Sequence, residues 1–186
     1  MDEHSRESNA ARKPDDTDAL FAMDALGPLT DETGEFRPSL DVPTITDCYA
    51  RGIECIRRRE WDTAIGYIRK GLDLDPLRRN SQTVIALANM GFCHDKLEAY
   101  EEAIAAYTLA IELDPQSEQA FAGLACVYMD LGHPAEALEA GERAAILRPD
   151  NPLTHYNLGN AHMAMQDFIG AIESYRQAIT HRPNLF

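Results

Sequence analysis

Apolar residues from position 45 onward recur at the three- and four-residue spacing of amphipathic helices, and short polar turns separate the segments. The clearest segment runs from His155 to Pro183 and reads HYNLGNAHMAMQDFIGAIESYRQAITHRP. It predicts two short helices, joined by a tight turn and closed by a proline. The same pattern upstream predicts helix pairs near 45–58 and 61–74, and near 84–97 and 100–113.

Residues at the helix boundaries support these pairs. Thr44 follows a proline and offers a hydroxyl as an N-cap. Asn151 followed by Pro152 is a well-formed start signal, because asparagine caps the free amides and proline suits the first helical position. Gly132 is expected to end a helix in the left-handed conformation.

Prolines and small residues repeat along the chain with one period. Pro115, Pro149 and Pro183 are spaced 34 residues apart, and Pro76 precedes Pro115 by 39 residues. Three rows of small residues keep the same register: Gly52, Gly91, Ala125 and Gly159 in the first helix of each pair, and Ala64, Ala103, Ala137 and Ala171, then Gly71, Ala110, Ala144 and Ala178, in the second. Because glycine costs about 1 kcal/mol against alanine inside a helix, glycine within these helices indicates close packing.

This helix–turn–helix period with small residues at fixed places resembles the tetratricopeptide repeat. The resemblance covers residues 45–185, with repeats at 45–78, 84–117, 118–151 and 152–185. It implies an all-α fold, a right-handed α-solenoid in which stacked repeats bury one another's apolar sides. Five extra residues, RNSQT at 79–83, explain the longer interval; they either extend the next helix at its start or form a short loop.

Residues 1–44 differ from the repeats and are expected to form a disordered acidic N-terminal arm. They hold eleven acids and four bases, and residues 1–17 show no periodicity. Within the arm, residues 18–29 (DALFAMDALGPL) form a short apolar segment that could be one helical stretch. One hypothesis is that this segment occupies a groove of the repeats, in cis or in a neighbouring chain, until a partner displaces it; the alternative is an idle segment.

Charge and composition exclude several classes of partner. A formal net charge of −14 repels phosphate backbones, so nucleic acid is not an expected ligand. The first residues have no apolar core of a signal peptide, and the longest apolar run is too short to span a bilayer. Four cysteines without paired spacing indicate reduced packing residues. We therefore expect a cytoplasmic protein without membrane insertion.

Motifs of catalysis and cofactor binding are not found in the sequence. It contains no phosphate-binding glycine loop, no nucleophile elbow and no zinc-binding helix signature. His155 and His162 are seven residues apart on one predicted helix, about 10 Å along its axis, which is too far to share a metal directly. The expectation is a non-enzymatic protein with no cofactor and no metal.

The resemblance implies a peptide-binding groove on the concave side, lined by the first helix of each repeat. By register, the residues expected to line it are Tyr49, Ile53, Ile56, Asn89, Phe92, Cys126, Met129, Tyr156, Asn157, Asn160 and Met163. This is an apolar trough with a few amides, suited to an apolar segment whose backbone the asparagines hold.

Co-chaperones of the same family bind terminal carboxylates with a clamp of lysine, arginine and asparagine. Here Tyr49 and Ile53 stand at the positions of the first lysine and asparagine, Gln119 and Gly123 at those of the later lysine and arginine, and only Asn89 matches. Binding of a terminal carboxylate is therefore expected to be poor.

These observations favour a protein–protein interaction adaptor or scaffold that binds a peptide segment of a partner in the concave groove. Two alternatives remain open: a secretion-type chaperone holding an apolar client segment, and the repeat region of a larger enzyme or regulatory complex. The sequence stops at Phe186, directly after the fourth repeat and without a polar capping helix. Either the natural protein is longer or the fourth repeat packs on another molecule. Self-association through that uncapped repeat or through the arm is a further expectation.

Overall fold

A computed structural model describes residues 43–181 of the 186-residue chain. The hypothesis that residues 18–29 occupy a groove, and the predicted disorder of the arm, concern residues outside this described part.

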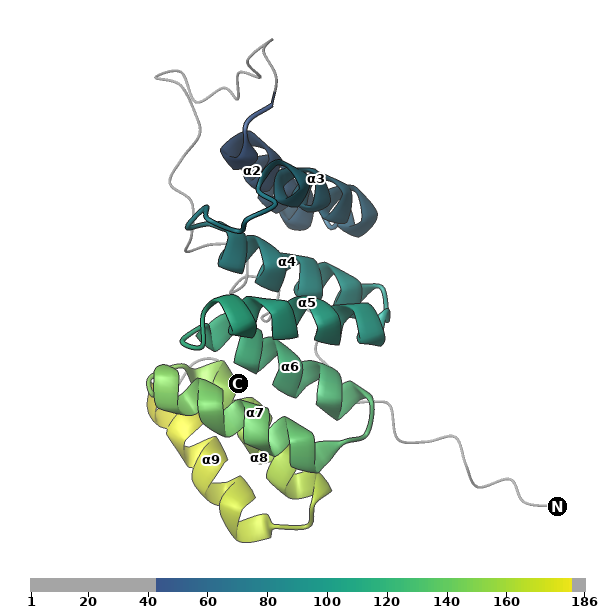
Figure 1. Cartoon of the computed structure of the whole chain (residues 1–186). Helices are drawn as coiled ribbons and strands as arrows, with labels where there is room; N and C mark the ends of the chain where they lie inside the picture. The colour runs from purple at the N-terminus through teal and green to yellow at the C-terminus, as the bar shows by residue number, and fades with distance from the viewer. Residues whose placement is uncertain (1–42, 182–186) are drawn as a thin grey trace, which may run out of the picture.

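The described part consists of eight α-helices and contains no strand. Their bounds are α2 Ile45–Arg57, α3 Trp61–Leu74, α4 Thr83–Lys96, α5 Tyr100–Leu113, α6 Glu118–Asp130, α7 Pro134–Leu147, α8 Pro152–Ala164 and α9 Phe168–His181. Figure 1 shows them stacked in chain order as four helix pairs, α2–α3 to α8–α9. The predicted all-α solenoid is confirmed, with helix bounds within one residue of those expected for the first two pairs.

Local signals in the sequence account for the helix ends. The Thr44 hydroxyl accepts a hydrogen bond from the Asp47 amide at 3.1 Å, while the Asp47 carboxylate accepts one from the Thr44 amide at 3.0 Å, which completes a capping box. Asn151 caps α8 by accepting from the Leu153 amide at 3.1 Å. Gly132 lies just beyond α6 with φ of +75°, as expected for a helix-ending glycine.

The periodic small residues allow aromatic and aliphatic side chains to enter between helices. The Tyr107 ring of α5 lies over Gly91 of α4 and Gly123 of α6, where a Cβ atom would stand 2.8 Å and 2.2 Å from ring carbons. Tyr175 of α9 covers Gly159 of α8 in the same way, at 2.4 Å. The packing role predicted for Gly91 and Gly159 is therefore confirmed, and Tyr107 also joins two successive repeats.

The hydrophobic core is uneven along the stack. One continuous cluster of buried side chains runs from Tyr49 in α2 to Ala140 in α7. The described residues of α8 and α9 contribute nothing to it, and α9 carries several exposed isoleucines instead. The first three repeats thus share one core, and the fourth joins the stack through the interface of α7 with α8, where Leu158 lies against Gly141.

Acidic side chains, one buried and one partly buried, connect successive repeats at their junctions. Between α3 and α4, the Asp75 carboxylate accepts hydrogen bonds from the Thr83 hydroxyl at 2.7 Å and from the Arg79 and Asn80 amides at 2.9 Å and 3.1 Å. Four of the five extra residues therefore form an ordered loop, and the fifth, Thr83, begins α4.

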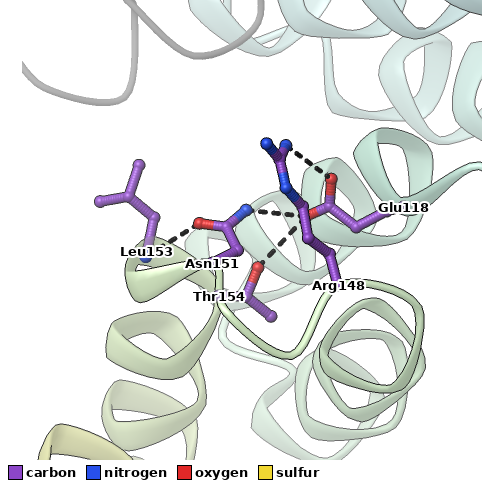
Figure 2. A network of polar contacts seen from close by, with 5 residues as sticks. All are labelled: Glu118, Arg148, Asn151, Leu153 and Thr154. Atoms are coloured by element: carbon purple, nitrogen blue, oxygen red, sulfur yellow. Dashed lines mark hydrogen bonds and ion pairs between the residues drawn. The ribbon is translucent and has the colours of Figure 1, made fainter. Parts of the chain in front are cut away.

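The junction between the third and fourth repeats uses Glu118 at the start of α6 (Figure 2). Its Oε1 accepts from Asn151 Nδ2 at 2.8 Å and from the Thr154 hydroxyl at 3.3 Å, while Arg148 approaches its Oε2 at 3.9 Å. One carboxylate thus holds the cap of α8 as well as its first turn.

Candidate peptide-binding surface

Five of the residues expected to line the groove are buried: Tyr49, Ile53, Ile56, Asn89 and Phe92. The Tyr49 ring lies against Gly71 of α3, and its hydroxyl donates to Thr83 Oγ1 at 3.2 Å, since Thr83 gives its own proton to Asp75. The Phe92 ring meets Trp61 edge-on, with centroids 5.7 Å apart. The expectation that these five side chains are accessible is corrected, because contacts between helices take up their surface.

Asn89 has a specific place within this buried group. It lines a small cavity together with Tyr49, Ile53, Ile68, Gln82, Ile85 and Ala86. In the described part of the chain, its Oδ1 and Gln82 Oε1 are buried acceptors without a hydrogen-bond partner. The cavity is about the size that one water needs, so it suits a bridging water better than a peptide side chain.

The other six predicted residues retain access to solvent and lie on α6 and α8. We call them the α6–α8 surface: Cys126, Met129, Tyr156, Asn157, Asn160 and Met163. Cys126 and Met129 are one helical turn apart on α6, and the four α8 residues are spaced at turns of one face. Asn157 Nδ2 donates to Cys126 Sγ at 3.2 Å, which joins the two helices. Met163 is the most exposed member, at 45%.

Tyr175 of α9 positions the α8 side of this surface, a role that the sequence analysis missed. Its hydroxyl donates to Asn160 Oδ1 at 2.8 Å, and its ring lies 5.8 Å from that of Tyr156. Burial raises the pKa of the Tyr175 hydroxyl, so it remains a donor at neutral pH. The signal in the sequence was its register, because Tyr175 occupies in the fourth repeat the place of Tyr107 in the second.

The fixed amides present complementary hydrogen-bonding groups. Tyr175 occupies the Asn160 carbonyl, which leaves Nδ2 as a donor, whereas Cys126 occupies the Asn157 amide nitrogen, which leaves Oδ1 as an acceptor. Within residues 43–181 these two remaining atoms have no partner. A donor and an acceptor one helical turn apart match the alternating groups of a peptide backbone.

The packing also explains why this chain lacks a carboxylate clamp. Gly123, at the position of the clamp arginine, lies under the Tyr107 ring, and even a Cβ atom there would meet Tyr107 Cζ at 2.2 Å. Tyr49 and Ile53, at two further clamp positions, are buried. The α6–α8 surface itself carries no carboxylate, lysine, arginine or histidine.

The two histidines that were considered as metal ligands, His155 and His162, have local partners. His155 stacks on His181 with centroids 5.5 Å apart, and His162 Nδ1 lies 2.9 Å from Asp167 Oδ2. Between positions 43 and 181, no three His, Cys, Asp or Glu side chains gather where they could hold a metal ion. None of the described helices combines the length and apolarity needed to cross a membrane.

Comparison with known proteins agrees with the repeat pattern. The family model of the tetratricopeptide repeat matches residues 84–117 and 152–185. The Hsp70-Hsp90 organizing protein 1 of Glycine max is 32% identical over 89 residues, which are 48% of this chain and 16% of that protein. The DnaJ homolog subfamily C member 3 homolog of Dictyostelium discoideum is 26% identical over 153 residues, which are 76% of this chain and 30% of that protein.

Two solved structures show the same arrangement of helices. The crystal structure of MamA has a TM-score of 0.67 at 19% identity, over 76% of this chain and 80% of that one. The first tetratricopeptide domain of Spaghetti (RPAP3), bound to the HSP90 peptide SRMEEVD, has a TM-score of 0.56 at 27% identity, over 57% of this chain and 85% of that one.

The chain contains tetratricopeptide repeats, since the family model matches two of its four helix pairs. The repeats, together with the related Spaghetti (RPAP3) domain that was solved with a bound peptide, support a protein–protein interaction module. Because the chain spans only 16% of the length of the first curated relatives, the activities of those whole proteins are not carried over to it.

Proposed function

We propose that this protein is a non-enzymatic adaptor that binds a peptide segment of a partner protein on the α6–α8 surface. The observation that carries the proposal is the pair of asparagines, Asn157 and Asn160, each held by a neighbour through one amide atom. Because their orientation is fixed before binding, little side-chain entropy is lost when a peptide is bound.

The chemistry of the surface defines the expected ligand. Met129 and Met163 flank the amides with flexible apolar side chains, and Tyr156 adds a ring with a polar tip. The ligand is therefore an apolar segment that presents backbone N–H and C=O groups to Asn157 and Asn160. A free terminal carboxylate contributes nothing, since the surface offers it no cation.

The experiment is selection from a random-peptide library, followed by affinity measurement with synthetic peptides. Selected peptides are expected to be apolar and to bind equally well with a free or an amidated C-terminus. Replacing both asparagines by alanine should weaken binding about tenfold or more, since two hydrogen bonds of roughly 1 kcal/mol each are lost. Ile146→Ser, on the exposed side of α7, is the matched control and should leave affinity unchanged.

The peptide SRMEEVD is the second probe, because the related Spaghetti (RPAP3) domain was solved with it. We expect no saturable binding to this chain. Binding that depends on the free carboxylate would contradict the proposal, as would apolar peptides whose affinity survives the double asparagine substitution.

A secretion-type chaperone that holds an apolar client is the second candidate. The methionines favour it, because Met129, Met163 and the exposed Met165 can adapt to many apolar shapes. The same library separates the two functions. An adaptor selects peptides that share one sequence pattern, whereas a chaperone selects many unrelated apolar sequences of similar affinity.

A further inference from the structure

The outer side of α9 carries a stripe of exposed apolar residues. Phe168, Ile169, Ile172 and Ile179 are 58%, 83%, 69% and 52% exposed, and Met165, just before the helix, is 46% exposed. Their spacing of three and four residues places them along one side of the helix. We call this set the α9 face.

In earlier repeats, residues at the same register as part of the α9 face are covered by neighbouring helices. Ile172 has the register of Ile65 in α3 and Ile104 in α5; Ile65 is buried and Ile104 partly buried. Likewise Ile179 has the register of Leu72 in α3, which is 5% exposed. In the first repeat α4 packs on this side of α3, since Trp61, which has the register of Phe168, meets Phe92 of α4 edge-on. Among the described residues α9 packs on α8, so the part of the face formed by Phe168, Ile172 and Ile179 is a repeat-to-repeat interface with only one side present. Ile169 extends this face beyond the earlier interfaces, because its counterparts Asp62 and Glu101 are exposed.

We propose that the α9 face is a self-association surface, covered by the α9 face of a second copy around a two-fold axis. The arrangement continues an interface that the chain already uses between its own repeats. Antiparallel helices place Phe168 beside the partner's Ile179, with the two copies of Ile172 near the two-fold axis. Both copies contribute the same residues, as two-fold symmetry requires.

Charges beside the stripe are complementary in this arrangement. Arg176 lies within the stripe, between Ile172 and Ile179, and Glu173 lies beside it; the two residues carry opposite signs. When the two helices run antiparallel, Glu173 of each copy approaches the partner's Arg176. The antiparallel orientation also opposes the two helix dipoles, which is favourable.

The available area matches a weak but specific dimer. From their exposed fractions, the five residues of the α9 face present roughly 600 Å² in each copy, so two copies bury on the order of 1,200 Å², the lower end for specific interfaces. Such a patch is at the upper end of what a monomer exposes without use. We therefore expect a dissociation constant in the micromolar range.

Sedimentation velocity of the full 186-residue chain, from about 1 to about 100 µM, tests the proposal. The wild type should shift from monomer to dimer across this range. Ile169→Glu and Ile172→Glu should each weaken association at least tenfold. Ile146→Glu, 66% exposed on α7, is the matched control and should associate like the wild type. Circular dichroism verifies that each variant keeps its helices.

Charge reversal identifies the two-fold arrangement itself. In Glu173→Arg or Arg176→Glu alone, positions 173 and 176 carry the same charge, so both contacts between chains become repulsive and each variant should remain monomeric. Each change also breaks the hydrogen bond that Arg176 Nη2 donates to Glu173 within the chain, at 2.9 Å. When the two variants are mixed, the chain-internal contact stays broken, but both contacts between chains are again attractive. Heterodimers should therefore form from two monomeric variants.

Three results overturn the proposal. The first is a wild type that remains monomeric at about 100 µM, which leaves the face to a different protein or a further helix. The second is a dimer that Ile172→Glu does not weaken. The third is a mixture of the two charge variants that remains monomeric although both are folded and the wild type dimerises.

Discussion

The substitution of Gly123 by alanine tests how tightly successive repeats interlock. Gly123 lies under the Tyr107 ring, and its added Cβ would stand 2.2 Å from Cζ and 2.4 Å from Cε1. The ring is fully buried and also lies against Gly91. Because it has no free space to move into, the strain should pass to the backbones of α4 and α6.

Two opposing effects set the magnitude. Alanine is favoured over glycine inside a helix by about 1 kcal/mol. Overpacking a well-filled core costs about 1–3 kcal/mol. We therefore expect Gly123→Ala to destabilise the protein by about 1 kcal/mol in net terms. Gly66 of α3 is the matched control, since it is exposed and a Cβ there would meet nothing within 4 Å. Gly66→Ala should stabilise by about 1 kcal/mol.

Urea unfolding followed by circular dichroism measures both variants. With a slope of about 2 kcal/mol per molar urea, the Gly123→Ala midpoint should fall by about 0.5 M and the Gly66→Ala midpoint should rise by about 0.5 M. Repeating Gly123→Ala in a Tyr107→Leu background removes the ring, so alanine should then stabilise as it does at Gly66. A Gly123→Ala midpoint at or above that of the wild type would refute the reasoning.

Two further predictions concern the acids at the junctions. Hydrogen bonding by the Thr83 hydroxyl, and then by backbone amides, lowers the pKa of Asp75 below its usual 3.8. As pH falls, Asp75 is therefore protonated in the unfolded chain before it is protonated in the folded protein. The ionised carboxylate stabilises the fold fully above the usual pKa, and this contribution is lost as pH falls through the lowered pKa of the folded state. Lowering the pH should thus decrease the urea midpoint less in Asp75→Asn than in the wild type. An equal decrease in both proteins would contradict this. Glu118→Ala leaves Asn151 Nδ2 without its acceptor and should cost about 1–3 kcal/mol, seen as faster amide exchange in the first turn of α8. Glu118→Gln retains an acceptor oxygen and should cost less; equal losses would show that the hydrogen bonds are not the cause.

Much of the fold was predictable because its determinants are local and periodic. Asn151 with Pro152, and Thr44 after a proline, marked helix starts that the structure retains. The rows of small residues indicated which helices approach closely, since a mid-helix glycine has few other uses. Asp75 was not recognised as the centre of a junction, because its partners include Thr83, eight residues further along.

The candidate site was less predictable, for a physical reason. Register places a residue on a side of a helix but does not show how deeply the neighbouring helices cover that side. Tyr49 and Tyr156 share one register, yet Tyr49 is buried while Tyr156 is partly exposed. The difference comes from the following repeat, which covers Tyr49 through Thr83 of α4, whereas no described helix follows α9.

The ending of the shared core at Ala140 has a consequence for how the chain opens. In a repeat protein, the free energy of unfolding is approximately the sum of each repeat's own stability and of the interface energies between adjacent repeats. Since α8 and α9 lie outside the cluster, the fourth repeat should fray first while the other three remain folded. In the proposed dimer, the α9 face of the second copy provides a further interface energy that stabilises the fourth repeat. Protein concentration would then control how far the last helix pair is folded, and with it the lifetime of the α8 half of the peptide-binding surface.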